Sequence, residues 1–152
     1  MITMDELLMG RAKLADLPSD VQDNLRKLLF AMNEIRASYG FVMIITSGYR
    51  RPQDNDATSN AAKLSAHLVG MACDIRDVDG SLYRWVLRNL DLMQKLGIYL
   101  EDFRWTRSKT KGNWVHFGIR KPGSGKRIFV PSTAPAEDPG CWDGKYDSKY
   151  DS

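Results

Sequence analysis

The chain has 152 residues, of which 43% are hydrophobic and 27% are charged, a balance that suits one globular domain with a modest core. Its net charge is +3 at pH 7, and no apolar run approaches the roughly 20 residues that a membrane-spanning helix needs. The N-terminus has neither a basic segment nor a long apolar segment, so we expect no secretory signal peptide.

The charge is unevenly distributed along the chain. Residues 132–152 carry five acidic side chains and two lysines, a net charge of −3, so the first 131 residues carry +6. A basic body could attract an anionic polymer such as a cell wall or a nucleic acid, although an ordinary solvated surface explains the same charge. The same two interpretations apply to a basic run near the end of the body, formed by Arg104, Arg107, Lys109 and Lys111.

The two cysteines, Cys73 and Cys141, give no CxxC pair. Neither a disulfide framework nor a thiolate zinc site is therefore expected. Cys73 lies in an apolar run, and we expect it to be a buried structural residue. The two tryptophans at positions 105 and 114 could line a binding site, but the core is the more common place for such residues.

The first half of the chain predicts helices followed by a strand. A weak helical pattern covers residues 4–12. A strong one covers 20–38, where apolar residues recur at spacings of three and four between a possible N-cap, Ser19, and Gly40. Residues 41–46 form a short β-branched run typical of a buried strand.

The polar segment that follows, residues 47–63, predicts a long loop, and long ordered loops are often functional. After it we expect a turn at Asp79-Gly80 and a basic turn at 108–113. One further helix and four strands are expected around these turns: a helix at 82–96, and strands at 71–76, 98–105, 114–120 and 127–130. This order predicts an α+β domain in which helices cover one side of a small antiparallel sheet.

The C-terminal segment, residues 132–152, ends in a direct repeat of Lys-Tyr-Asp-Ser. It is too short and polar to build a core, so we expect an extended or poorly ordered tail.

Both histidines of the chain lie in contexts that suit a metal site. His67 precedes Asp74 by seven residues, with Gly70 and the small Ala72 allowing a tight passage from loop to strand. His116 lies on a later strand and could face the same point. A His/Asp/His set suits zinc and leaves one tetrahedral position open, as a hydrolytic site requires.

Three motifs together resemble the M15 zinc D-Ala-D-Ala peptidases, which belong to a wider group that includes hedgehog-type domains. The resemblance extends over residues 1–131, which we interpret as the zinc peptidase domain, and it is greatest to the phage-encoded, endolysin-like members. It rests on Ser47-Gly48-Tyr49-Arg50 with Asn55, on Ser65-x-His67-x-x-Gly70-x-Ala72-x-Asp74-Ile75, and on Trp114-Val115-His116.

This resemblance implies zinc ligands at His67, Asp74 and His116. It implies that Arg50 binds the substrate and stabilises a developing oxyanion, for which a fixed charge with a forked geometry is suited. A salt bridge that anchors the loop is the alternative role for Arg50. Ser65 would orient the site through a hydrogen bond, or be an ordinary turn residue.

The general base is where the chain departs from the family pattern. Many M15 members carry an acid three residues before the second histidine, but this chain has Asn113, whose amide cannot take up a proton at neutral pH. Other members place the acid on the preceding strand, where Glu101 and Asp102 are the candidates. Because side chains alternate along a strand, one of the two should face the metal, and we favour Glu101. The alternative is that both are surface carboxylates and the enzyme is impaired.

The resemblance therefore implies a zinc peptidase that cleaves peptidoglycan stem peptides, either as a D-Ala carboxypeptidase or as a cell-wall endopeptidase in phage lysis. A catalytically impaired, zinc-stabilised wall-binding module is the alternative, and a nucleic-acid binder has no motif to support it. We expect a monomer without nucleic-acid partners or stable membrane association. It would be made in the host cytoplasm and act on the wall after release.

Overall fold

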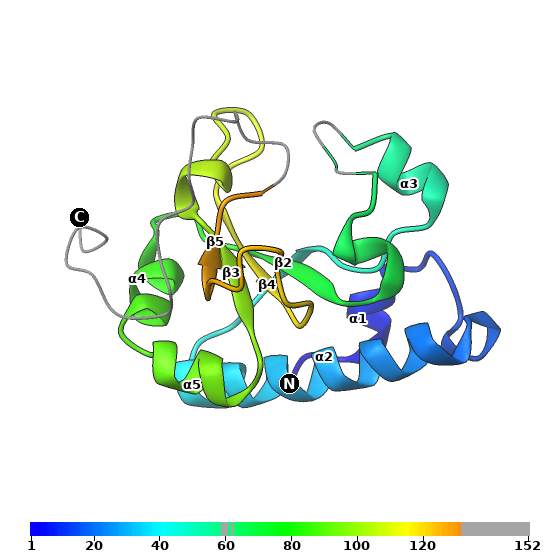
Figure 1. The fold of residues 1–152 in the computed structure, drawn as a ribbon, viewed down its shortest axis with the longest axis horizontal. Coiled ribbons are helices and arrows are strands. Elements are labelled where there is room, and N and C mark those ends of the chain that lie inside the picture. Colours follow the sequence, from blue (N-terminus) through cyan, green and yellow to red (C-terminus); the bar gives the residue numbers. More distant parts are fainter. Residues whose placement is uncertain (59–60, 62, 132–152) are drawn as a thin grey trace.

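The fold is a five-stranded sheet with helices packed against one face (Figure 1). The computed structural model describes residues 1–58, 61 and 63–131. The strands lie in the order β1-β2-β4-β3-β5. Their bounds are Ile45–Ser47 (β1), Ala72–Arg76 (β2), Tyr99–Glu101 (β3), Trp114–Gly118 (β4) and Ile128–Phe129 (β5).

The longest helix, α2, runs beneath the sheet in Figure 1, and α1 and α5 lie on the same side. The α-helices are Met4–Leu8 (α1), Ser19–Tyr39 (α2), Pro52–Asp56 (α3), Ser81–Leu87 (α4) and Leu90–Lys95 (α5). Three short 3₁₀ turns complete the described elements: Leu14–Asp16 (η1), Ala66–Val69 (η2) and Phe103–Trp105 (η3).

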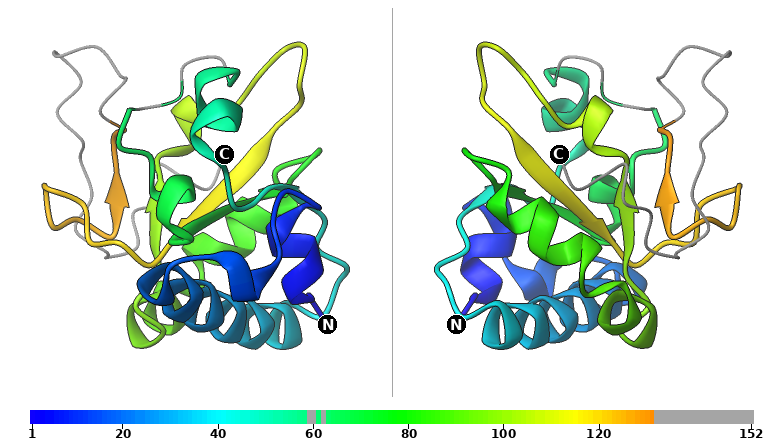
Figure 2. Two further views of the ribbon diagram at one scale, coloured as in Figure 1. Left: turned by 90° about the vertical axis from the view of Figure 1, so that its right-hand side faces the viewer. Right: turned by 90° about the vertical axis from the view of Figure 1, so that its left-hand side faces the viewer.

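The predicted α+β class is confirmed. Neighbouring strands from β1 to β3 pair antiparallel, as expected, whereas the short edge strand β5 runs parallel to β3. The core lies between the sheet and the helices, where Leu25 and Met32 of α2 join Val115 and Phe117 of β4 in complete burial. The opposite face of the sheet is the one from which α3 and the hairpin of residues 106–113 rise (Figures 1 and 2).

The predicted N-terminal helix is shorter than expected. α1 ends at Leu8 rather than at residue 12, because Met9 adopts a left-handed conformation with φ 54°. The strong helix is confirmed, although Ser19 is its first residue and Pro18 takes the cap position. It ends at Gly40 as predicted.

Two predicted segments differ from the structure in the middle of the chain. The buried strand at 41–46 is wrong for its first residues, because Phe41 and Val42 are 68% and 76% exposed and only Ile45–Ser47 pair with β2. The loop at 47–63 contains α3, a short helix that has Pro52 at its start.

The helix predicted at 82–96 is two helices, α4 and α5. The break falls at Asn89, whose side-chain amide donates to the carbonyl of Trp85 at 2.8 Å and so terminates α4. This local hydrogen bond competes with the helix, as asparagine side chains commonly do. The strand predicted at 98–105 likewise ends at Glu101, since Asp102 caps η3 by accepting from the Arg104 backbone N–H at 3.0 Å.

Among the described residues, no helix combines the length and the apolar character that crossing a membrane would require.

Truncating the core should cost much of the stability of the domain. We expect Phe117→Ala to lower the free energy of unfolding by about 3–5 kcal/mol, because a fully buried aromatic ring leaves a cavity. Urea unfolding measures this. Phe30→Ala is the matched control, since that ring is 66% exposed, and it should change the stability by less than about 0.5 kcal/mol. Equal effects of the two variants would contradict the assigned core.

Candidate metal centre

The pairing of β2 with β4 brings Asp74 and His116 together. These two residues are direct partners in the antiparallel ladder, and their neighbours Cys73, Val115 and Phe117 are completely buried in the core. Because side chains alternate across a strand, Asp74 and His116 project from the opposite face of the sheet. The predicted burial of Cys73 is thereby confirmed, and burial raises the pKa of its thiol far above the ordinary value.

His67 reaches the same point from η2. Its ring nitrogen Nδ1 lies 2.8 Å from the backbone carbonyl oxygen of Gly48. Because a carbonyl oxygen only accepts, Nδ1 donates this hydrogen bond, and Nε2 faces Asp74 Oδ2 at 3.5 Å. Ser65 caps η2 by accepting from the His67 backbone N–H at 3.3 Å. Gly70 ends η2 with φ 72°, and a side chain there would collide with Leu25 of α2.

The three side chains form a compact donor set. His116 Nδ1 lies 2.9 Å from Asp74 Oδ1, and the rings of His67 and His116 are 5.3 Å apart at their centroids. One ligand atom from each of the three residues lies within 4.8 Å of the others, and all three residues are buried. Two imidazoles and one carboxylate at this spacing fit a zinc ion and leave one coordination position for water or substrate.

The charges of the cluster support one another. Burial disfavours the ionised form of Asp74, but His67 and His116 outweigh that effect and hold the pKa of its carboxyl well below the usual range. Burial also acts to lower the pKa of His116, yet the nearby Glu101 and Asp74 raise it to about 9. Without a metal, His116 is therefore protonated at neutral pH and forms an ion pair with Asp74.

Arg50 lies beside the cluster and is 8% exposed. Its Nη2 is 3.8 Å from Asp74 Oδ2, its Nε donates to Ser47 Oγ at 3.1 Å, and its Nη1 donates to Asn55 Oδ1 at 3.4 Å. Burial lowers the pKa of Arg50 from its usual value, partly offset by Asp74, and the group stays charged at neutral pH. The side chain thus pairs with a cluster residue while loop residues hold its position.

Glu101 approaches the cluster from β3, and Asp102 does not. Glu101 Oε1 lies 3.9 Å from His116 Nδ1, and burial raises the pKa of this carboxyl above its usual value. Asp102 is 1% exposed and forms a two-pronged ion pair with Arg104, with distances of 3.0 Å from Oδ1 to Nε and from Oδ2 to Nη2. Neither residue is a surface carboxylate, and Glu101 is the one that the structure brings to the histidines.

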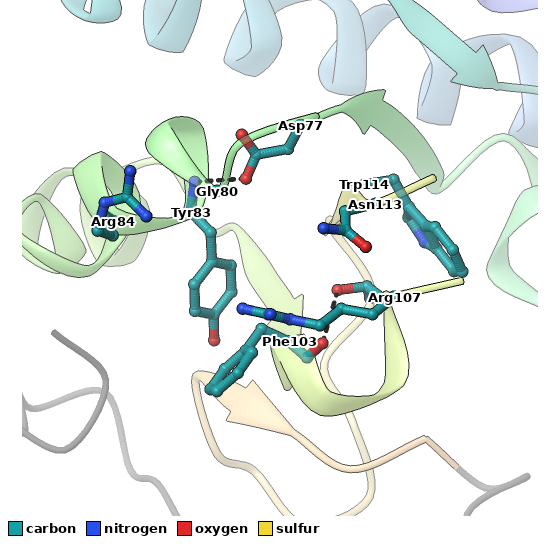
Figure 3. Close-up of a pocket in the computed structure, with 9 residues that line it drawn as sticks. Asp77, Gly80, Tyr83, Arg84, Phe103, Arg107, Asn113 and Trp114 are labelled. Carbon is teal, nitrogen blue, oxygen red and sulfur yellow. Dashed lines mark hydrogen bonds between the residues drawn. The ribbon is translucent and has the colours of Figure 1, made fainter. Parts of the chain in front are cut away.

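Asn113 is not part of the cluster. Its backbone carbonyl accepts from the Asp77 N–H at 2.9 Å, and its side chain lines a separate small pocket with Asp77, Tyr83 and Arg107 (Figure 3). The Asp77 carboxylate accepts from the backbone N–H groups of Leu82 and Tyr83, both at 3.0 Å, and so caps α4. This pocket belongs to the connection between β2 and α4, and its lining includes none of the proposed zinc ligands.

Some residues at the site were not identified from the sequence. Phe129 of β5 pairs in register with Glu101, and its ring meets the His116 ring edge-on at 6.2 Å. A two-residue edge strand carries too little periodicity to reveal this. Trp105 and Trp114, expected in the core, are only half-buried. The basic run is exposed as a solvated surface would be, with Arg104 paired to Asp102 and Arg107 lying 4.6 Å above the Phe103 ring.

A buried His-Asp-His cluster with a neighbouring carboxylate is the arrangement of a metal-dependent hydrolase. The Peptidase M15 family model matches residues 2–103, about two thirds of the chain. The chain therefore belongs to the M15 peptidase family, whose members are zinc-dependent. The matched segment contains Arg50, His67, Asp74 and Glu101, whereas His116 lies beyond its end. A search of curated proteins found no match to the chain.

Zinc binding should release a proton at neutral pH. The pKa of His116 is about 9 without metal, so its ring must lose a proton before Nδ1 can bind an ion. We expect about one proton released per zinc at pH 7, decreasing as the pH rises through 9. Calorimetry in buffers of different ionisation enthalpy measures this number. His67→Ala should abolish stoichiometric zinc uptake, and zinc binding without proton release at pH 7 would contradict the protonated His116.

Proposed function

We propose that this protein is a zinc peptidase that hydrolyses peptide bonds in bacterial peptidoglycan stem peptides, with His67, Asp74 and His116 as zinc ligands. The observation that carries the proposal is the approach of the Glu101 carboxylate to within 3.9 Å of His116 in the buried cluster. Family membership supports peptidase chemistry. A zinc ion held by the cluster would act as a Lewis acid that polarises the scissile carbonyl and acidifies water.

In this proposal Glu101 is the general base. Its carboxylate takes a proton from the attacking water and returns it to the leaving amine. The raised pKa of Glu101 suits both steps, because a base whose pKa lies nearer to neutral pH releases the proton as readily as it accepts it. Asp102 cannot take this role without breaking its ion pair with Arg104.

Arg50 is proposed to bind the substrate and to stabilise the negative charge that develops on the carbonyl oxygen. Its guanidinium group is charged and buried, donates hydrogen bonds to Ser47 and Asn55, and lies 3.8 Å from Asp74. Such a preorganised donor acts strongly at a site from which water is excluded. The loop-anchoring role is compatible with this one, since Ser47 and Asn55 fix the side chain in place.

Two bonds of the stem peptide are candidate substrates: the bond to a terminal D-Ala, and an internal or cross-link bond. Digestion of purified peptidoglycan, with and without chelator, followed by mass spectrometry separates them. Release of free alanine identifies a carboxypeptidase, and new internal amino termini identify an endopeptidase. We further propose that the enzyme acts in phage lysis as a monomer after release from the host cytoplasm, on the basis of its resemblance to phage-encoded members.

The second candidate is a zinc-stabilised wall-binding module without catalysis. The amide of Asn113, at the position where many M15 members carry an acid, is the feature that favours it. The same digestion decides between the two: a protein that binds zinc and peptidoglycan but cleaves no bond is such a module.

Glu101→Gln should abolish most of the activity while leaving zinc bound. We expect kcat to fall by about 10²–10⁴-fold, because the amide cannot accept the proton. Asp102→Asn is the matched control. It should reduce thermal stability through the lost ion pair with Arg104 but keep kcat within a few-fold at a temperature where the protein is folded. The opposite pattern in peptide-cleavage assays would assign the base to Asp102.

A further inference from the structure

Three residues at the end of α1 or just after it form hydrogen bonds with the backbone of Gly48 and Tyr49. We call Leu7, Met9 and Arg11 the N-terminal clamp. The Tyr49 N–H donates to the Leu7 carbonyl at 2.8 Å, and the Arg11 Nη1 donates to the Tyr49 carbonyl at 2.7 Å. The Gly48 N–H donates to the sulfur of Met9 at 2.9 Å. The clamp thus contacts three of the four backbone polar groups of Gly48 and Tyr49.

The other side of that segment contacts His67. The Gly48 carbonyl accepts from His67 Nδ1 at 2.8 Å, and the Arg50 N–H donates to the His67 carbonyl at 3.1 Å. Gly48 therefore links Met9 to His67. Its N–H donates to the Met9 sulfur, and its carbonyl oxygen accepts from the His67 ring. A displacement of this residue would move the acceptor that sets the orientation and the tautomer of His67.

The approach of the clamp leaves no room for a side chain at position 48. A Cβ on Gly48 would overlap the carbonyl oxygen of Leu7, a backbone atom that cannot turn aside. Glycine at this position thus has a steric reason.

Met9 combines a left-handed backbone at the end of α1 with a side-chain contact to Gly48. Among the described residues it is the one non-glycine with a positive φ, at 54°, and its side chain is not buried in the core, since 36% of the residue is exposed. Left-handed backbone is unfavourable for a residue with a side chain and persists where surrounding contacts require it. In this conformation the Met9 N–H caps α1 by donating to the Asp5 carbonyl at 3.0 Å, and the Met9 sulfur accepts from the Gly48 N–H.

We propose that Met9 is a positioning residue for the metal centre. Its sulfur fixes Gly48, and the Gly48 carbonyl, which accepts from His67 Nδ1, holds the imidazole ring with Nε2 directed at Asp74. The inference rests on the proposed zinc site and assigns a role to an N-terminal residue outside the motifs that define the site.

Two substitutions at position 9 separate hydrogen bonding from packing. Met9→Leu keeps the volume and removes the acceptor, whereas Met9→Gln keeps an acceptor of similar reach. We expect zinc to bind Met9→Leu about tenfold more weakly than the wild type, the lower end of the effect of residues that support metal ligands. Met9→Gln should bind zinc within about twofold of the wild type. Met43→Leu, the same change at a buried core methionine, should leave the affinity unchanged.

Zinc affinity is measured by competition with a chromophoric chelator, and nitrogen NMR of the metal-free protein reports on the hydrogen bond between His67 Nδ1 and the Gly48 carbonyl. We expect this hydrogen bond to be retained in the wild type and in Met9→Gln, and to be weakened in Met9→Leu. Equal affinity and an unchanged NMR signature in Met9→Leu would overturn the proposal, as would equal losses in both position-9 variants. A wild type that binds no zinc would contradict the proposed function instead, and the NMR comparison would still decide the role of Met9.

Discussion

The antiparallel pairing of β2 with β4 is the constraint on which the site depends. It places Asp74 opposite His116 and, on the other face of the same two strands, buries Cys73 and Phe117. Burial of the apolar side chains on one face stabilises the register of the two strands. That register brings Asp74 and His116 into contact on the other face. Two elements outside this pair bring further side chains to Asp74 and His116. The turn η2 contributes His67, and β3 contributes Glu101.

The side chains of the cluster compensate one another's charges. An isolated buried carboxylate would be strongly unfavourable, but Asp74 has His67, His116 and the Arg50 guanidinium around it. Zinc bound by these three side chains would displace the proton of His116.

The sequence allowed the α+β class to be predicted, because apolar residues recur with the 3.6-residue period of a helix along α2. It also allowed the His67, Asp74 and His116 cluster to be predicted, because the motifs around these residues resemble those of a known family. It could not define features that depend on single contacts. The break at Asn89 depends on one side-chain hydrogen bond, and the end of β3 depends on the cap formed by Asp102. The sequence favoured Glu101 over Asp102 through strand alternation alone, and only the structure shows that Glu101 approaches His116 while Asp102 pairs with Arg104. The position of Phe129 needed the parallel pairing of β5.

The alternation of β4 has a consequence for how the protein can be monitored. His116 lies between Val115 and Phe117, so a shift of the β2–β4 register by one residue would turn the histidine toward the helices and a bulky apolar side chain toward Asp74. A misregistered molecule would thus keep much of its secondary structure and lose the donor set. Occupancy by a coloured cobalt ion would then count correctly assembled molecules in a preparation, a distinction that circular dichroism does not make.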